Sequence, residues 1–182
     1  MKKLISMLLA LSMVLCLAAC GGNDTPATEA PTEAPAAKVE GTMEELLYKV
    51  IEIQPVEFMG GAMPLDLTDT SEDGKWMIKN YTGLDSADAI TEAAFYEPMM
   101  GSIPYSMVMV RTAEGADIKA VAEGMKNGID TRKWICVEAD DLQVVSYGDV
   151  VMLIMVGSDT GMTSQAFVDA FSQVCGGTVT KY

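Results

Sequence analysis

The chain has 182 residues, contains no histidine, and carries 12 Lys and Arg residues against 26 Asp and Glu residues. Without histidine it cannot build a Ser-His-Asp hydrolase triad, an H-E-x-x-H metalloprotease helix or a His-ligated zinc site. The formal net charge of −14 repels phosphate groups, so nucleic acid is not expected as a partner, whereas basic partners and divalent cations are compatible with this charge.

Residues 1–19 have the layout of a secretory signal peptide. Lys2 and Lys3 give a positive start, an apolar run extends to Leu17, and two alanines follow. The run is shorter than the about 20 residues that a membrane-spanning helix needs. Leu17-Ala18-Ala19-Cys20 resembles a bacterial lipobox, which implies that Cys20 receives a diacylglycerol and holds the exported protein on the outer face of the cell membrane. The alternatives are an uncleaved anchor or a coincidental cysteine.

Residues 20–41 are predicted to form a disordered linker that begins with the lipidated Cys20. Thr28-Glu29-Ala30-Pro31 is repeated directly as Thr32-Glu33-Ala34-Pro35. Few apolar side chains and repeated proline leave too little surface to bury for a stable fold. The remaining residues, 42–182, have the length of one globular domain.

The domain is predicted to start with an amphipathic helix. Thr42 and Glu45 form a capping-box pattern ahead of apolar residues at helical spacing, and Pro55 is expected to end the helix. The segment Gln54–Lys75 is predicted to be irregular because it is rich in Gly, Pro and acidic residues. The next segment, Trp76–Tyr81, fits either a short helix or a short strand.

Two strands and a helix are predicted in the middle of the domain. The first strand is Ile90–Glu97, and Pro98 limits it to a sheet edge or makes it the end of a strand. The second strand is Tyr105–Thr112. A helix is expected from about Ala116 to Ile129, with its apolar residues on one face.

The last part of the domain contains the clearest signal, a tight hairpin. Two apolar runs, Leu142–Tyr147 and Val150–Val156, flank Gly148-Asp149, a pair typical of a two-residue turn. The second run is apolar on both faces, which predicts a position in the middle of a sheet. A final helix is expected to be capped by Thr163 and to end at Gly176.

This order of elements predicts an α+β fold. It reads helix, two strands, helix, two strands, helix, with hairpins joining the strand pairs. We therefore expect an antiparallel sheet of about four strands with helices packed mainly on one face, in two layers.

Three features of the chain resemble a known family. The lipobox, the Thr/Glu/Ala/Pro linker and the run from Tyr147 to Gly157 are similar to short lipoproteins of the domain-of-unknown-function family 4358, which are frequent in anaerobic Gram-positive bacteria. The likeness covers the end of the domain closely and residues 42–100 only loosely. It implies a compartment and a fold, and it brings no catalytic residues.

One acidic segment partly matches a calcium-binding loop. Asp69, Ser71 and Asp73 occupy the first, third and fifth places of the loop pattern, but Asn80 stands where a bidentate glutamate is needed. An acidic turn is the alternative interpretation. Any calcium site here would be of the weak extracellular kind.

Exposed methionines and aromatic residues are the candidate binding residues. Met99 and Met100 fall in an irregular segment beside Tyr96 and Tyr105, where together they could line an adaptable groove or an aromatic platform for a sugar or peptide. Met59 and Met63 fall in irregular segments too, so exposed thioethers could also bind copper(I). Packing in the core is the alternative for all of these residues.

Two cysteines remain in the domain. Cys136 and Cys175 could form one disulfide outside the cell, or each could be buried as a small apolar residue. Two thiols alone cannot build a structural zinc site.

These features favour a non-catalytic lipoprotein that binds an envelope protein or a small ligand and is held on the membrane by its lipid. No cofactor is predicted. The alternative is a carboxylate-dependent hydrolase of cell-wall material, which would need a cleft with two acids, one of them with a raised pKa.

Overall fold

The computed structural model of the chain describes residues 37–182. The predicted signal peptide, the predicted lipidation site Cys20 and the tandem repeat of the linker lie outside these residues. Within them, four α-helices, one 3-10 turn and six strands follow one another in the order α1 (Met43–Ile53), β1 (Gly60–Pro64), α2 (Glu72–Thr82), β2 (Ile90–Pro98), β3 (Tyr105–Thr112), α3 (Ile118–Gly128), β4 (Asp141–Tyr147), β5 (Val150–Val156), η1 (Ser158–Thr160), α4 (Ser164–Cys175) and β6 (Thr180–Lys181).

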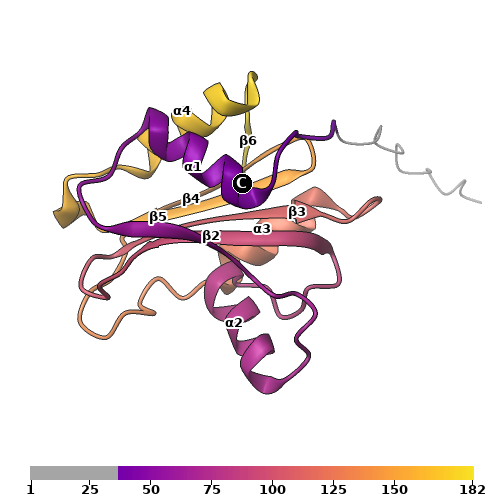
Figure 1. Ribbon diagram of the computed structural model, residues 1–182, viewed down its shortest axis with the longest axis horizontal. Helices are drawn as coiled ribbons and strands as arrows, with labels where there is room; N and C mark the ends of the chain where they lie inside the picture. Colours follow the sequence, from indigo (N-terminus) through magenta and orange to yellow (C-terminus); the bar gives the residue numbers. More distant parts are fainter. Residues whose placement is uncertain (1–36) are drawn as a thin grey trace, which may run out of the picture. The chain divides into compact units, whose positions relative to one another are not determined.

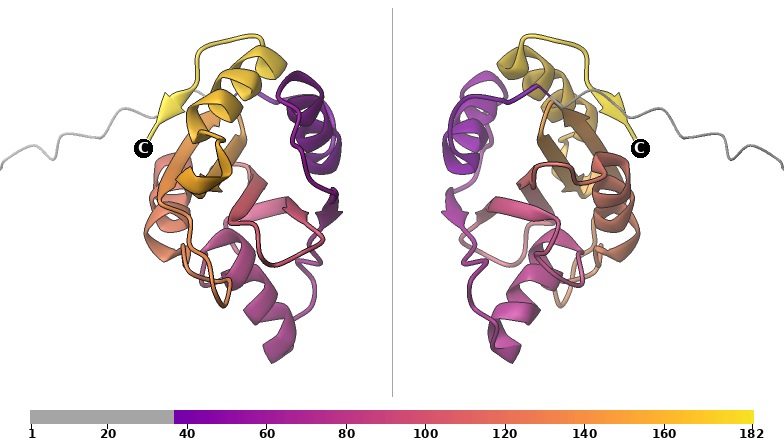
Figure 2. Two further views of the ribbon diagram at one scale, coloured as in Figure 1. Left: turned by 90° about the vertical axis from the view of Figure 1, so that its left-hand side faces the viewer. Right: turned by 90° about the vertical axis from the view of Figure 1, so that its right-hand side faces the viewer.

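The strands form one antiparallel sheet in the order β1-β2-β3-β5-β4-β6. Helices α1 and α4 cover one face of this sheet, and α2 and α3 cover the other (Figures 1 and 2). The fold is therefore α+β, as predicted, but it has three layers instead of two and six strands instead of four. The expectation of helices mainly on one face was wrong.

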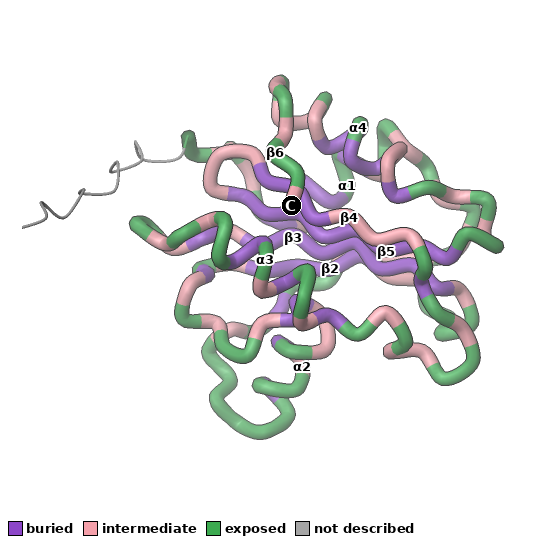
Figure 3. The backbone as a smooth tube through the Cα atoms, turned by 180° about the vertical axis from the view of Figure 1, so that it is seen from behind, coloured by how far each residue is buried: buried purple, intermediate pink, exposed green. Residues whose placement is uncertain are grey.

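Strand β5 shows why both faces need a cover. All seven of its residues are buried, and they alternate between two cores. Ile154 contributes to the core under α1 and α4, the α1/α4 core, whereas Leu153 contributes to the core under α2 and α3, the α2/α3 core. A strand that is apolar on both sides would expose half of its residues in a two-layer sandwich. Figure 3 shows the buried central strands between the two outer layers.

The two unpredicted strands lie at the edges of the sheet. Strand β1 reads Gly-Gly-Ala-Met-Pro, a composition that disfavours strands, and it forms because all five residues pair with β2. Strand β6 is only two residues long and pairs with β4. Pro98 is the last residue of β2, where the missing amide hydrogen of proline is tolerated. Because β2 lies between β1 and β3, the predicted edge position is wrong, and the predicted strand end is confirmed.

The predicted helix and hairpin signals are confirmed with one change. Both hydrogen bonds of the Thr42–Glu45 capping box are present, and Tyr147 pairs with Val150 across the predicted turn. The segment Trp76–Tyr81 belongs to a helix, α2, which Ser71 caps. Thr163 occupies the N-cap of α4 without a side-chain hydrogen bond, because Asp141 accepts hydrogen bonds from the amide and hydroxyl of Ser164 instead.

The start of the domain is fastened to the sheet by Arg111 on β3. Its guanidinium pairs with Asp149 at 2.7 Å and with Glu92 at 3.2 Å. It also donates to the carbonyls of Val39 at 3.0 Å and Gly41 at 2.6 Å. The two carboxylates in turn accept hydrogen bonds from the amides of Val39 and Met43. We call this group, Arg111 with Glu92, Asp149 and residues 37–43, the entry clamp.

Residues 37–182 enclose two apolar cores. Both cores are built from residues 39–182, and no buried side-chain nitrogen or oxygen atom in the described part of the chain lacks a hydrogen-bond partner. Unpaired buried polar groups would cost about 1–3 kcal/mol each. A chain that begins at Gly21 therefore keeps every contact of the described residues.

We predict that Leu153→Ala and Ile154→Ala each lower the free energy of unfolding by about 2–5 kcal/mol, because each deletes a fully buried side chain from one of the two cores. Urea denaturation followed by circular dichroism measures both values. Met63→Ala, at a side chain that is 55% exposed, is the control and should change the value by less than about 1 kcal/mol. A small effect of either β5 substitution would contradict the three-layer arrangement.

We predict that Arg111→Met lowers the free energy of unfolding by about 3 kcal/mol, because it leaves two partly buried carboxylates without their cation. Hydrogen exchange at the amides of Val39 and Met43 should become faster. Arg132→Met is the matched control: Arg132 is 76% exposed in its ion pair with Glu138, and its loss should cost less than about 1 kcal/mol. Equal effects of the two substitutions would show that the entry clamp does not stabilise the domain.

Candidate binding site at the distal end

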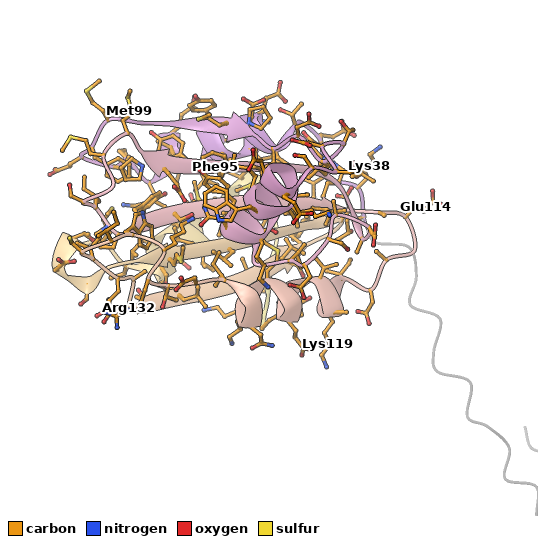
Figure 4. All side chains as sticks on the ribbon, turned by 90° about the horizontal axis from the view of Figure 1, so that it is seen from below. Lys38, Phe95, Met99, Glu114, Lys119 and Arg132 are labelled. Carbon is orange, nitrogen blue, oxygen red and sulfur yellow. The ribbon has the colours of Figure 1, made fainter. Side chains whose placement is uncertain are left out.

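Four connecting loops meet at the end of the sheet opposite the entry clamp. They are residues 54–59, 99–104, 129–140 and 157–163, and we call them together the distal end. Backbone hydrogen bonds join them, including Met99 N to Met59 O at 2.9 Å and Gly157 N to Pro104 O at 2.8 Å. In Figure 4, Met99 and Arg132 mark the distal end, while Lys38 and Glu114 mark the opposite end of the domain.

Exposed large apolar side chains concentrate at the distal end. Met59 and Met99 are each 78% exposed, Met100 is 66% exposed, and Ile135 is completely exposed. Ile53, 43% exposed, is the last residue of α1 before the first of these loops. Single exposed apolar residues are common, but a group of five at one end of a small domain is typical of an interaction surface.

A groove of about 530 Å³ lies between three of the distal loops. Phe58, Ile103 and Met162 give it apolar walls, and Glu57 and Thr160 contribute polar atoms. A smaller hollow of about 300 Å³ is lined mainly by polar and acidic residues, together with one thiol: Cys136, Val137, Glu138, Asp140, Ser158 and Asp159. Both hollows are open and shallow, so they are suited to binding a side chain or peptide and not to enclosing a small substrate.

The predicted aromatic platform is buried and does not face solvent. Tyr105 is fully buried and Tyr96 is 6% exposed, so their expected contact with a ligand was wrong. Their rings pack edge-on to each other, and Tyr105 contacts Phe58 with the ring centroids 5.0 Å apart. The two tyrosines therefore support the groove wall from beneath. Met99 and Met100 are the part of the predicted set that the structure places on the surface.

The charge of the distal end is negative. Its loops contain five acids, Glu57, Asp130, Glu138, Asp140 and Asp159, and two bases, Arg132 and Lys133. Neither base is free, because Arg132 pairs with Glu138 at 3.0 Å and Lys133 pairs with Glu97 on β2. Hydrogen bonds from Ser158 lower the pKa of Asp140, so this carboxylate keeps its charge in mildly acidic solution.

Lys133 holds the longest of the distal loops against the sheet. Its side chain is 5% exposed, and its ammonium donates to Glu97 and, at 3.1 Å, to Ser106. The same nitrogen lies 4.8 Å from the ring centre of Tyr81, which stacks on Phe95. Burial lowers the pKa of Lys133, while the neighbouring Glu97 opposes that shift. Because Ser106 is fully buried, this lysine and serine position a loop and present no nucleophile to a substrate.

Lys133 and its partners Glu97, Ser106 and Tyr81 could not be recognised as a group from the sequence. They come from a loop, a helix and two strands that are distant along the chain, so no local spacing brings them together. The one available signal was the run Arg132-Lys133-Trp134, where charge and a large aromatic ring are adjacent.

The two cysteines are free. Cys136 is exposed in the distal loops, whereas Cys175 is half-buried at the end of α4 against the α1/α4 core. The expected burial of Cys136 was therefore wrong. Burial raises the pKa of Cys175 to about 11, so its thiol stays protonated at neutral pH and reacts slowly. The structure does not join the two thiols in a disulfide.

The calcium candidates lie at the start of α2, away from the distal end. Asp69 accepts a hydrogen bond from the amide of Ser71, and the Ser71 hydroxyl caps the helix at Gly74. Hydrogen bonds from Ser71 lower the pKa of Asp69. Two of the three candidates thus take part in starting a helix. In residues 37–182, no group of three or more His, Cys, Asp or Glu side chains is placed to hold a metal ion.

No family model matches the chain, and neither a curated protein nor a solved structure matches it. Among the described residues, no helix is both long and apolar enough to cross a membrane. The geometry and charge of the distal end are therefore the observations that bear on function.

We predict that Tyr105→Phe changes the free energy of unfolding by less than about 1 kcal/mol at neutral pH, because the Tyr105 hydroxyl bonds only to the sulfur of Met107, at 3.9 Å. Burial raises the pKa of Tyr105 well above 10, so the unfolded chain loses this proton at a lower pH than the folded protein does. The part of the folding stability that depends on a protonated Tyr105 is then fully present below about pH 10 and is lost as the pH rises further. Urea denaturation at neutral and alkaline pH should show a smaller alkaline loss for the variant than for the unchanged chain. Equal losses would mean that Tyr105 reaches solvent.

Proposed function

We propose that the protein is a lipoprotein anchored through Cys20 to the outer face of the cell membrane, and that its distal end binds another molecule of the envelope without catalysis. One observation carries this proposal. The described residues enter the domain at the entry clamp, and Met59, Met99, Met100 and both hollows lie at the opposite end.

The entry clamp supports this orientation. The backbone of residues 37–43 is fixed to β3 and to the β4–β5 turn by hydrogen bonds with the side chains of Arg111 and Asp149, at the end of the domain remote from Met99. A lipid on Cys20 would tether the domain through its entry end. A linker of 20 residues reaches at most about 60 Å when it is extended as polyproline II. Such a linker would keep the distal end within reach of partners on the envelope.

Binding without catalysis agrees with the chemistry of the described residues better than hydrolysis does. A carboxylate-dependent hydrolase needs an acid whose pKa is raised. The carboxyl groups with a displaced pKa, Asp66, Asp69, Glu72 and Asp140, all have it lowered by hydrogen bonds. The buried Lys133 and Ser106 are unreachable. The strongly acidic surface also disfavours nucleic acid.

Membership of the domain-of-unknown-function family 4358 stays a prediction. The resemblance rests on the lipobox, the linker and the β4–β5 hairpin. It agrees with a protein of the outer membrane face but adds no ligand. Calcium receives no support from the geometry, because the acidic turn caps a helix. Copper(I) binding by the exposed methionines stays a prediction.

The thiols of the chain allow a direct test of this proposal in intact cells that express the full chain. We predict that labelled palmitate is incorporated into the protein, and that Cys20→Ser abolishes the label and releases the protein from the membrane. A maleimide that cannot cross membranes should label the protein on intact cells through Cys136, because this thiol is exposed whereas Cys175 is half-buried.

The matched controls separate the two parts of this prediction. Cys136→Ser should remove the maleimide label, and Cys175→Ser should leave it unchanged. A protein that takes up no palmitate, or that reacts with the maleimide only after the cells are broken, would show that the proposed location is wrong.

A further inference from the structure

We infer that the ligand of the distal end is a segment of another protein that carries apolar anchor residues flanked by Lys or Arg. This inference rests on the proposed function and names the chemistry of the partner. It follows from the shape, the side chains and the charge of the distal end.

The exposed methionines and the groove lie on neighbouring loops of the distal end. Met59 follows Phe58 of the groove wall, and the backbone bond from Met99 to Met59 brings the next loop beside it. Ile103, four residues beyond Met99, returns to the groove. Methionine side chains are flexible and polarisable, so the exposed methionines of the distal end can adapt to apolar side chains of different shape. A groove of this volume accepts one or two large side chains and leaves the rest of the ligand on the surface.

The charged part of the surface selects the flanking residues of the ligand. Glu57 lies in the groove, and Asp140 and Asp159 lie in the neighbouring hollow, all three exposed. The bases of the distal loops are already paired, so the potential that an incoming ligand meets is negative. Complementary charges raise the association rate and exclude ligands of the same sign.

Other occupants fit the same surface less well. A second copy of this chain would bring a second set of five acids against the first, and an anionic lipid surface would also be repelled. A partner strand would need free amide hydrogens along the edge of β1. The Ala62 amide already donates a hydrogen bond to the Tyr48 hydroxyl, and Pro64 has no amide hydrogen, so an added strand is disfavoured. The groove, and not the sheet edge, is therefore the site for an extended or helical segment.

The test uses the soluble chain from Gly21 to Tyr182 and three labelled peptides of equal length. The first peptide combines Leu with Lys, the second replaces every Lys with Glu, and the third replaces every Leu with Ser. Fluorescence anisotropy measures the affinity at low and high salt. The Leu/Lys peptide should bind, the other two should bind at least about tenfold more weakly, and added salt should weaken the Leu/Lys complex.

Two pairs of variants locate the binding. The double substitution Met99→Ser with Met100→Ser should weaken binding about tenfold, because apolar contact is lost. Met63→Ser, an exposed methionine outside the distal end, is its control and should bind normally. Glu57→Gln should weaken binding and reduce its salt dependence, whereas Glu114→Gln, at the entry end, should change neither. Circular dichroism of each variant verifies that it is folded.

Each remaining outcome overturns the inference. Equal binding of the Leu/Lys and Leu/Glu peptides would refute the charge selection, and weaker binding by Met63→Ser than by the double variant would refute the location. Binding of no peptide, or dimers that the double variant dissociates, would exclude this class of partner. The palmitate and maleimide experiments do not depend on these results, so the proposed anchoring and exposure are judged separately.

Discussion

The burial of β5 on both faces is the constraint on which the rest of the structure depends. Seven consecutive buried residues cannot lie at an edge or under a single layer of helices. They require β3 and β4 as neighbours and a helical layer on each face of the sheet. Helices α1 and α4 form one of these layers, and α2 and α3 form the other. With both faces of the sheet occupied by packing, the sheet itself leaves only its ends and edges for binding.

The two ends of the sheet differ in what holds them. The entry end is fixed by Arg111 and two carboxylates, whose charges are satisfied within the domain. At the distal end the side chains that hold the loops, Lys133, Tyr96 and Tyr105, are buried beneath them. The methionines above are largely exposed, so their contacts contribute little to the stability of the fold. This separation lets the surface change in sequence while its support stays the same.

Local signals in the sequence predicted the elements but not the layers. The Thr42–Glu45 cap, the Gly148-Asp149 turn and the periodicity of α3 depend on neighbouring residues, so they can be read from the chain alone. Strand β1 forms through pairing with β2, against the preference of its own glycines and proline, so no local pattern predicts it. Tyr96 and Met99 are three residues apart, yet one is core and the other surface, because the strand ends between them. The apolar run of β5 did contain the information for a third layer.

The entry clamp also determines how the domain responds to force. Arg111 belongs to β3, a strand in the middle of the sheet, and it donates hydrogen bonds to the carbonyls of Val39 and Gly41 just ahead of α1. For a protein tethered through its N-terminal side, a pull on the tether reaches this guanidinium and the Asp149 turn before it reaches the first helix. The tension is thereby passed to β3 and the β4–β5 hairpin, and α1 is shielded from being peeled off the sheet.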